Sequence, residues 1–128
     1  MIYNAKLIYI DNIVEENIII KIGNYFLTCF ANICPYFIEV GKTYPVSMNL
    51  FFIDGPDFIE VSDDVAEEII HIDDGFRYSL TGILHDGVFS VGELDFCDEN
   101  SFYEFQYLEG KKLNLQVDRL DVEFKELR

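Results

Sequence analysis

The sequence has little positive charge. Lysine and arginine together number nine against 24 aspartate and glutamate residues, which gives a formal net charge of −15 at pH 7. Nucleic-acid backbones and anionic membrane surfaces carry charge of the same sign, so both are disfavoured as direct partners. A basic protein would be attracted, because the summed field of a charged protein steers oppositely charged partners toward it.

Cysteine and export signals are also scarce. The three cysteines, Cys29, Cys34 and Cys97, are an odd number without a Cys-x-x-Cys pair, which is typical of reduced thiols in the cytosol. The N-terminal segment lacks the charged start and the cleavage site of a signal peptide. No window approaches the roughly eighteen apolar residues that a membrane span needs. We therefore expect a cytoplasmic protein without a membrane partner.

Catalytic and metal-binding motifs are missing as well. His71 and His85 are the two histidines, and nothing local supports a nucleophilic pair of Cys97 with His85. The acidic spacings do not match the calcium loop, and two histidines with scattered cysteines make no zinc pattern. We expect no enzyme activity, no catalytic residue, no metal site and no cofactor.

The sequence is rich in apolar residues arranged in strand patterns. Half of the residues are hydrophobic and twenty are Phe or Tyr, enough to build the core of one domain over residues 1–128. Short strands with tight turns predict an all-β fold, with at most one short helix. We expect an antiparallel β-barrel or β-sandwich of about eight strands, with an OB-like barrel among the options. The predicted strands cover residues 6–13, 18–22, 25–31, 43–53, 78–84, 88–96, 102–108 and a final segment from 113 to 124.

Turn and bend signals divide these strands. Asp86-Gly87 predicts a two-residue hairpin turn, and Gly82 predicts a bulge or a sharp bend. Apolar residues occupy odd positions before Asp118-Arg119 and even positions after it. This phase change indicates a bulge, or two strands that meet at a corner.

An acidic segment over residues 54–74, DGPDFIEVSDDVAEEIIHIDD, contains no Lys or Arg. Its residues 63–70 fit a short helix and its residues 66–72 fit a strand, and both interpretations stay open. Crowded like charges store repulsion that a cationic partner would relieve. We expect this segment to bind a basic protein, with Phe58 and Tyr78 as aromatic anchors. Its nine carboxylates are Asp54, Asp57, Glu60, Asp63, Asp64, Glu67, Glu68, Asp73 and Asp74.

In class rather than in motif, the chain resembles the small acidic immunity proteins of bacterial toxin–immunity pairs. The resemblance is carried by its size, its single-domain build, its lack of catalytic residues and the DGPDFIEVSDDVAEEIIHIDD run. It implies a bacterial cytoplasmic protein that neutralises a basic toxin, such as a nuclease, by covering its active site. The alternative is a small-ligand-binding β-barrel, because twenty aromatic residues could line an apolar cavity.

Overall fold

The chain is an all-β protein. The computed structural model describes residues 1–97 and 102–127, and 54% of these residues are in strands and 5% in helix. The all-β prediction is confirmed, and the described residues form more strands than expected. These strands are β1 (Tyr3–Ile10), β2 (Asn17–Ile22), β3 (Tyr25–Ile33), β4 (Thr43–Phe51), β5 (Phe58–Glu60), β6 (Glu68–His71), β7 (Tyr78–His85), β8 (Val88–Val91), β9 (Leu94–Phe96), β10 (Lys112–Val117) and β11 (Arg119–Phe124), with one 3-10 helix, η1 (Tyr103–Leu108).

Two compact units divide the chain. Unit 1 comprises Met1–Met48 and Leu120–Arg128, and unit 2 comprises Asn49–Arg119. The chain therefore leaves unit 1 within β4 and returns to it at the start of β11. The expectation of one domain over residues 1–128 stays a prediction. No helix among the described residues is long and apolar enough to cross a membrane.

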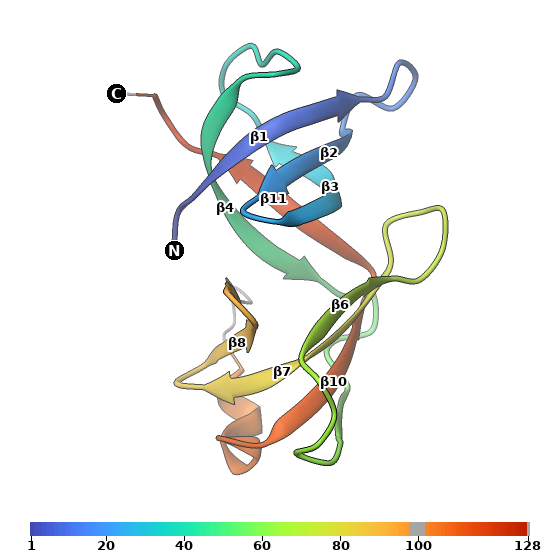
Figure 1. Ribbon diagram of the computed structural model, residues 1–128, viewed down its shortest axis with the longest axis vertical. Coiled ribbons are helices and arrows are strands. Elements are labelled where there is room, and N and C mark those ends of the chain that lie inside the picture. The colour runs from blue at the N-terminus through green and yellow to red at the C-terminus, as the bar shows by residue number, and fades with distance from the viewer. Residues whose placement is uncertain (98–101, 128) are drawn as a thin grey trace. The chain divides into compact units, whose positions relative to one another are not determined.

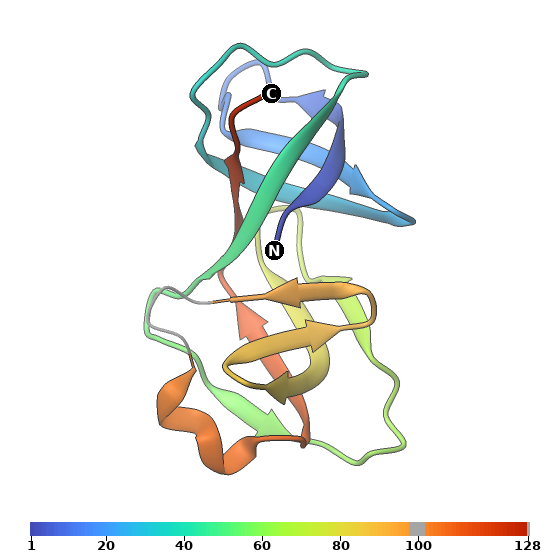
Figure 2. The ribbon, with the colours of Figure 1, turned by 90° about the vertical axis from the view of Figure 1, so that its left-hand side faces the viewer.

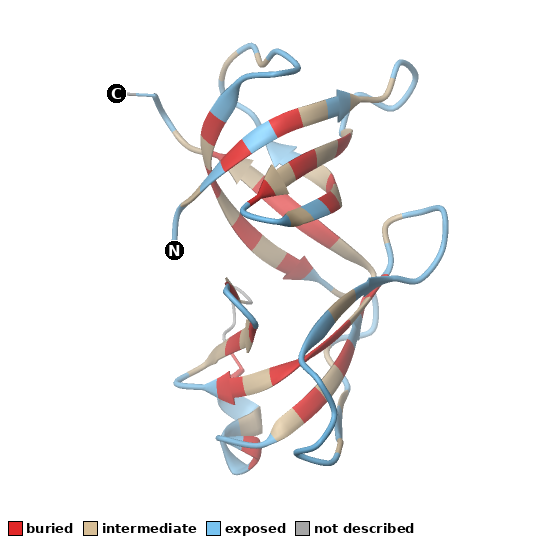
Figure 3. Cartoon of the chain, in the orientation of Figure 1, coloured by how far each residue is buried: buried red, intermediate tan, exposed pale blue. Residues whose placement is uncertain are grey.

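Unit 1 is a closed barrel with the strand order β1-β2-β3-β11-β4 (Figure 1). β11 runs parallel to β3, whereas β1 pairs antiparallel with both β2 and β4. A five-stranded closed barrel fits the OB-like option. Its interior is filled by alternate residues of the strands, and Figure 3 shows this alternation of buried and less buried positions along them. The buried residues are Ala5, Leu7, Ile18, Ile20, Leu27, Cys29, Val46, Met48, Leu120 and Val122.

Unit 2 contains a six-stranded sheet with the order β5-β10-β7-β8-β9, in which β6 also pairs with β7 (Figures 1 and 2). One edge of β7 pairs with β10 along residues 78–83. The opposite edge is shared, because β6 pairs with residues 78–81 and β8 with residues 83–85. β7 is thus the central strand, and β6 and β8 follow one another along it.

Two local predictions, the turn at Asp86-Gly87 and the break at Asp118-Arg119, are confirmed, whereas the bulge or bend at Gly82 stays a prediction. Asp86 and Gly87 have φ angles of 51° and 77°, the left-handed pair that a two-residue type I′ turn requires. Gly82 lies where β8 comes so close to β7 that a Cβ would be 2.1 Å from the backbone oxygen of Ser90. The phase change at Asp118-Arg119 separates β10 from β11.

One predicted strand is wrong, and one of the two interpretations left open for the acidic segment is confirmed. Residues 102–108 form η1 rather than a strand. Phe102, Phe105 and Leu108 recur every third residue, so a 3-10 turn brings all three to one side, and Phe102 and Leu108 are buried there. The helix over residues 63–70 does not form either. The strand alternative is confirmed as β6, because isoleucine-rich sequence favours extended backbone.

Candidate functional site

The acidic segment surrounds part of the unit 2 sheet on three sides. β5 pairs with β10 and β6 pairs with β7, so the two strands of this segment occupy opposite edges of β5-β10-β7-β6. We call these four strands the framed sheet. With neighbouring strands about 4.8 Å apart, its two edges are about 14 Å apart. The loop of residues 61–67 joins the edges at one end, where the Lys112 Nζ donates to the Val65 carbonyl oxygen at 2.8 Å.

All nine predicted carboxylates are exposed. Glu60 forms an ion pair with Lys111 at 3.2 Å. Glu67 accepts a hydrogen bond from the backbone N–H of Gly92 at 3.1 Å, and Asp73 accepts one from Gly75 at 2.8 Å. Within residues 1–97 and 102–127 the other six side chains have neither an ion pair nor a hydrogen bond: Asp54, Asp57, Asp63, Asp64, Glu68 and Asp74.

Charge is distributed unevenly between the two units. Unit 2 holds 17 of the 24 acidic residues and four of the nine basic ones. Arg119 lies over the Phe51 ring at 4.1 Å from its centroid, and Arg77 donates to the Gln116 side-chain oxygen at 3.5 Å. With 17 acidic and four basic residues, unit 2 has 13 more acidic than basic residues. The negative field of the protein is therefore concentrated on unit 2.

The two predicted aromatic anchors point into the core. Tyr78 is only 2% exposed, and its ring is stacked with that of His71 at a centroid distance of 4.7 Å. Phe58 is half-buried and its ring packs edge-to-face against three other phenyl rings at 5.0–5.5 Å. Phe58 and Tyr78 pair with Leu115 and Val117 of β10, both of which are buried. Tyr78 as a surface anchor is wrong, because β-strand alternation turns this ring inward.

The surface side of the framed sheet presents aliphatic side chains that sequence reasoning missed. Ile59 is 56% exposed and Ile70 is 45% exposed. They lie opposite Asn114 and Ser79 in the two ladders. The Asn114 amide donates to the Ser79 hydroxyl at 2.9 Å, which fixes the polar centre between them. The sequence signal that could have identified them is strand alternation. Ile59 directly follows Phe58, which faces the core, so its own side chain faces the surface, and Ile70 stands in the same relation to Ile69.

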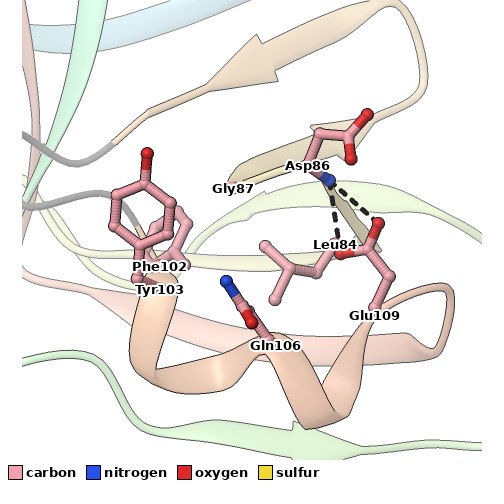
Figure 4. A pocket seen from close by; sticks show the side chains of 7 residues that line it. All are labelled: Leu84, Asp86, Gly87, Phe102, Tyr103, Gln106 and Glu109. Carbon is pink, nitrogen blue, oxygen red and sulfur yellow. Dashed lines mark hydrogen bonds between the residues drawn. The ribbon is translucent and has the colours of Figure 1, made fainter.

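A second cluster of titratable groups surrounds the turn between β7 and β8. His85 contacts Glu109 at 3.0 Å and Asp86 at 3.3 Å, and the Asp86 backbone N–H donates to the Glu109 carboxylate at 3.0 Å (Figure 4). Their possible ligand atoms lie within 4.8 Å of one another, and all three residues are exposed. Asp86 and Glu109, but not His85, border a hollow of about 410 Å³ beside Tyr103 and Gln106 of η1. One imidazole and two carboxylates are chemically suited to a divalent cation. The contact of His85 with Glu109 and the hydrogen bonds from the Asp86 backbone N–H to the same carboxylate already fasten the chain after η1 to this turn.

Unit 1 contains a second hollow and two contrasting thiols. The hollow, of about 520 Å³, is bordered by the β1–β2 connection and by Cys34, Tyr36 and Phe37.

Cys34 is exposed and donates to the Tyr36 carbonyl oxygen at 3.1 Å. Cys29 is fully buried, and burial, reinforced by the Asp121 carboxylate, raises the pKa of its thiol well above the usual range. Cys29 is therefore protonated and unreactive at neutral pH.

The fold and the charge distribution define an all-β protein with an acid-framed sheet. The family model described as Uncharacterised conserved protein UCP019853 matches residues 1–125, and the chain belongs to this family. Neither a curated protein nor a solved structure matches the chain.

Proposed function

We propose that this protein is a binding module that docks a basic partner protein on the framed sheet. The observation that supports the proposal is the set of six carboxylates that have no side-chain partner in the described part of the chain, placed around a sheet with a fixed polar centre. Like charges held around one surface repel one another, and a cationic partner removes that repulsion. Ile59 and Ile70 supply the apolar contact that charge alone does not give.

The finer form of the proposal is an immunity function in the bacterial cytoplasm. A nuclease binds phosphates with a cationic cleft, and carboxylates of the framed sheet would occupy the same cleft. The protein then inhibits by covering the active site, and it needs no catalytic group, cofactor or nucleic-acid contact of its own. Association would be rapid, because electrostatic steering raises association rates by about 10- to 1,000-fold.

The test first asks whether a gene adjacent to this one encodes a basic protein, which the proposal requires. Association with that protein is then measured by stopped flow at low and at near-physiological ionic strength. The variant is the double charge reversal Asp63→Lys with Asp64→Lys. We expect association to slow by about tenfold or more at low salt and its salt dependence to flatten. Protection of cells that express the adjacent protein would support the immunity function.

A matched control separates the framed sheet from net charge. Glu15 and Glu16 form an exposed acidic pair between β1 and β2 in unit 1. Their double reversal to lysine changes the net charge by the same amount, and we expect it to leave association nearly unchanged. Equal slowing by both double reversals, or no slowing by either, would overturn the proposal that this sheet is the docking surface.

A second candidate function is the binding of a small apolar ligand to unit 1. The barrel interior is filled by side chains, so a ligand would occupy the hollow beside Phe37, whose side chain is 85% exposed. Its volume of about 520 Å³ lies within the range of small-molecule sites. Native mass spectrometry of the purified protein would reveal a retained ligand, and replacing Phe37 by Ser should remove it.

A further inference from the structure

The β6 strand leaves one edge of the unit 2 sheet open. Beside the second half of β7 the sheet continues through β8 to β9, but beside the first half it ends at β6. Among the described residues, β6 pairs with no strand except β7. Three of its four residues are exposed, and Ile70 and the following Ile72 are 45% and 39% exposed. The sheet is thus one strand narrower here than beside β8.

The register shows which backbone groups of β6 face outward. The Ile72 N–H donates to the Arg77 carbonyl oxygen at 3.0 Å, and the ladder continues through the pairs Ile70–Ser79 and Glu68–Thr81. Hydrogen-bonded and non-hydrogen-bonded pairs alternate in an antiparallel ladder. Ile69 and His71 therefore direct their N–H and C=O groups away from β7. The close stacking of His71 on Tyr78 agrees, since side chains approach most closely in non-hydrogen-bonded pairs.

The other strand of the acidic segment offers a less accessible edge. Phe58 of β5 packs against Phe105 of η1 at a centroid distance of 5.0 Å, and Figure 2 shows η1 next to β5. Native proteins blunt an open edge by covering it, by shortening it or by placing charges on it. Within β6 and directly beside it, the charged side chains that perform this task are all negative: Glu67, Glu68, Asp73 and Asp74. They repel an acidic strand and attract a basic one.

We propose that an extended, lysine- or arginine-rich segment of the partner adds to β6 as a further antiparallel or parallel strand. This inference rests on the proposed function, which it extends by naming the mode of contact. Backbone hydrogen bonds to Ile69 and His71 give affinity, and alternate cationic side chains of the added strand reach the acids at both ends of β6. Residues between the cations lie against Ile70 and Ile72, so they are apolar.

The experiment uses two synthetic peptides as probes of the intact protein. One is an acetylated and amidated hexapeptide of alternating Lys and Val, and the other has the same sequence with alternate amides N-methylated on the edge that would pair. The two peptides have the same charge, but the second cannot complete a ladder. Binding is followed by calorimetry and by hydrogen exchange of ¹⁵N-labelled protein.

We expect the unmodified peptide to bind at least about tenfold more tightly, which corresponds to one or two net hydrogen bonds. Exchange at the amides of Ile69 and His71 should slow on binding. Ile70, whose N–H already faces Ser79, is the internal reference and should change less. Equal, salt-sensitive binding of both peptides would overturn strand addition while leaving the acidic docking surface in place. No binding of either peptide at low salt would count against both.

Discussion

Replacing Gly82 by alanine tests the packing on which the unit 2 sheet depends. At this residue the pairing partner along one edge of β7 changes from β6 to β8: Thr81 pairs with Glu68 of β6, and Ile83 pairs with Ser90 of β8. A Cβ on residue 82 would be 2.1 Å from the Ser90 backbone oxygen and 2.8 Å from a methyl group of Val91. A backbone atom cannot rotate away as a side chain can, so β8 must move.

The expected cost follows from two contributions. Overpacking at a closely packed position costs about 1–3 kcal/mol. A ladder hydrogen bond weakened by the movement of β8 adds about 1 kcal/mol. The free energy of unfolding should fall by about 3 kcal/mol, which lowers the Tm by on the order of 10 °C for a chain of this length. Urea unfolding followed by circular dichroism measures the change.

Gly75→Ala is the matched control. Its added Cβ would be 3.2 Å from the Asp73 Oδ1, the end of an exposed and flexible side chain. The free energy of unfolding should therefore change by no more than about 0.5 kcal/mol. If the Gly82→Ala protein is as stable as the Gly75→Ala protein, β8 does not lie in close contact with β7 at Gly82. The arrangement in which β6 and β8 share one edge of β7, on which the open edge of β6 depends, would then be refuted.

Two further outcomes are expected. Phe58→Ala should lower the free energy of unfolding by about 2–4 kcal/mol, because the Phe58 ring contacts three phenyl rings. Ile59→Ala, at a neighbouring and largely exposed position, should lower it by less than about 1 kcal/mol. Urea unfolding measures both variants, and equal costs would contradict the inward orientation of Phe58. Iodoacetamide should alkylate the exposed Cys34 rapidly in the native protein but the buried Cys29 only after denaturation. Mass spectrometry of digested samples detects the labelled cysteines, and labelling of Cys29 in the native protein would contradict its burial.

Features that depend on neighbouring residues were predictable from the sequence. Asp86-Gly87 specifies its turn because few other residues adopt positive φ at two consecutive positions. The phase change at Asp118-Arg119 marks the end of β10 because strand alternation has a period of two residues. Both features depend on the backbone conformation of a few consecutive residues, and contacts with distant segments do not change it.

Features that depend on distant segments were not predictable. The barrel closes through a parallel pair between β3 and β11, which join Phe30 to Asp121 across most of the chain. η1 was mistaken for a strand because Tyr103, Phe105 and Tyr107 alternate with polar residues. Tyr103 and Tyr107 are about 70% exposed, so this alternation did not report burial. Only the three-residue spacing of Phe102, Phe105 and Leu108 matched the side that faces the core.

In the acidic segment, too, the local feature was predictable from the sequence and the arrangement set by distant strands was not. The sequence shows nine carboxylates in 21 residues but not that β10 and β7 separate them. A helix over residues 63–70 would have held its acids about 5–6 Å apart. In the framed sheet, acids at the β5 edge and the β6 edge are about 14 Å apart, which exceeds the Debye length of about 8 Å at physiological salt. Strand pairing thus lowers the repulsion between acids of the β5 edge and acids of the β6 edge, whereas Asp63 and Asp64 stay adjacent in the connecting loop.

This separation dictates how two charge reversals combine. Asp57 adjoins β5 and Glu68 lies in β6, and neither side chain has a partner among the residues that the structure describes. Sites farther apart than about 10 Å with no shared partner act independently. The effects of Asp57→Lys and Glu68→Lys on the free energy of binding a basic partner should therefore add to within about 0.5 kcal/mol. Strong coupling between the two reversals, measured by a double-mutant cycle, would place both acids in one compact patch and contradict the framed arrangement.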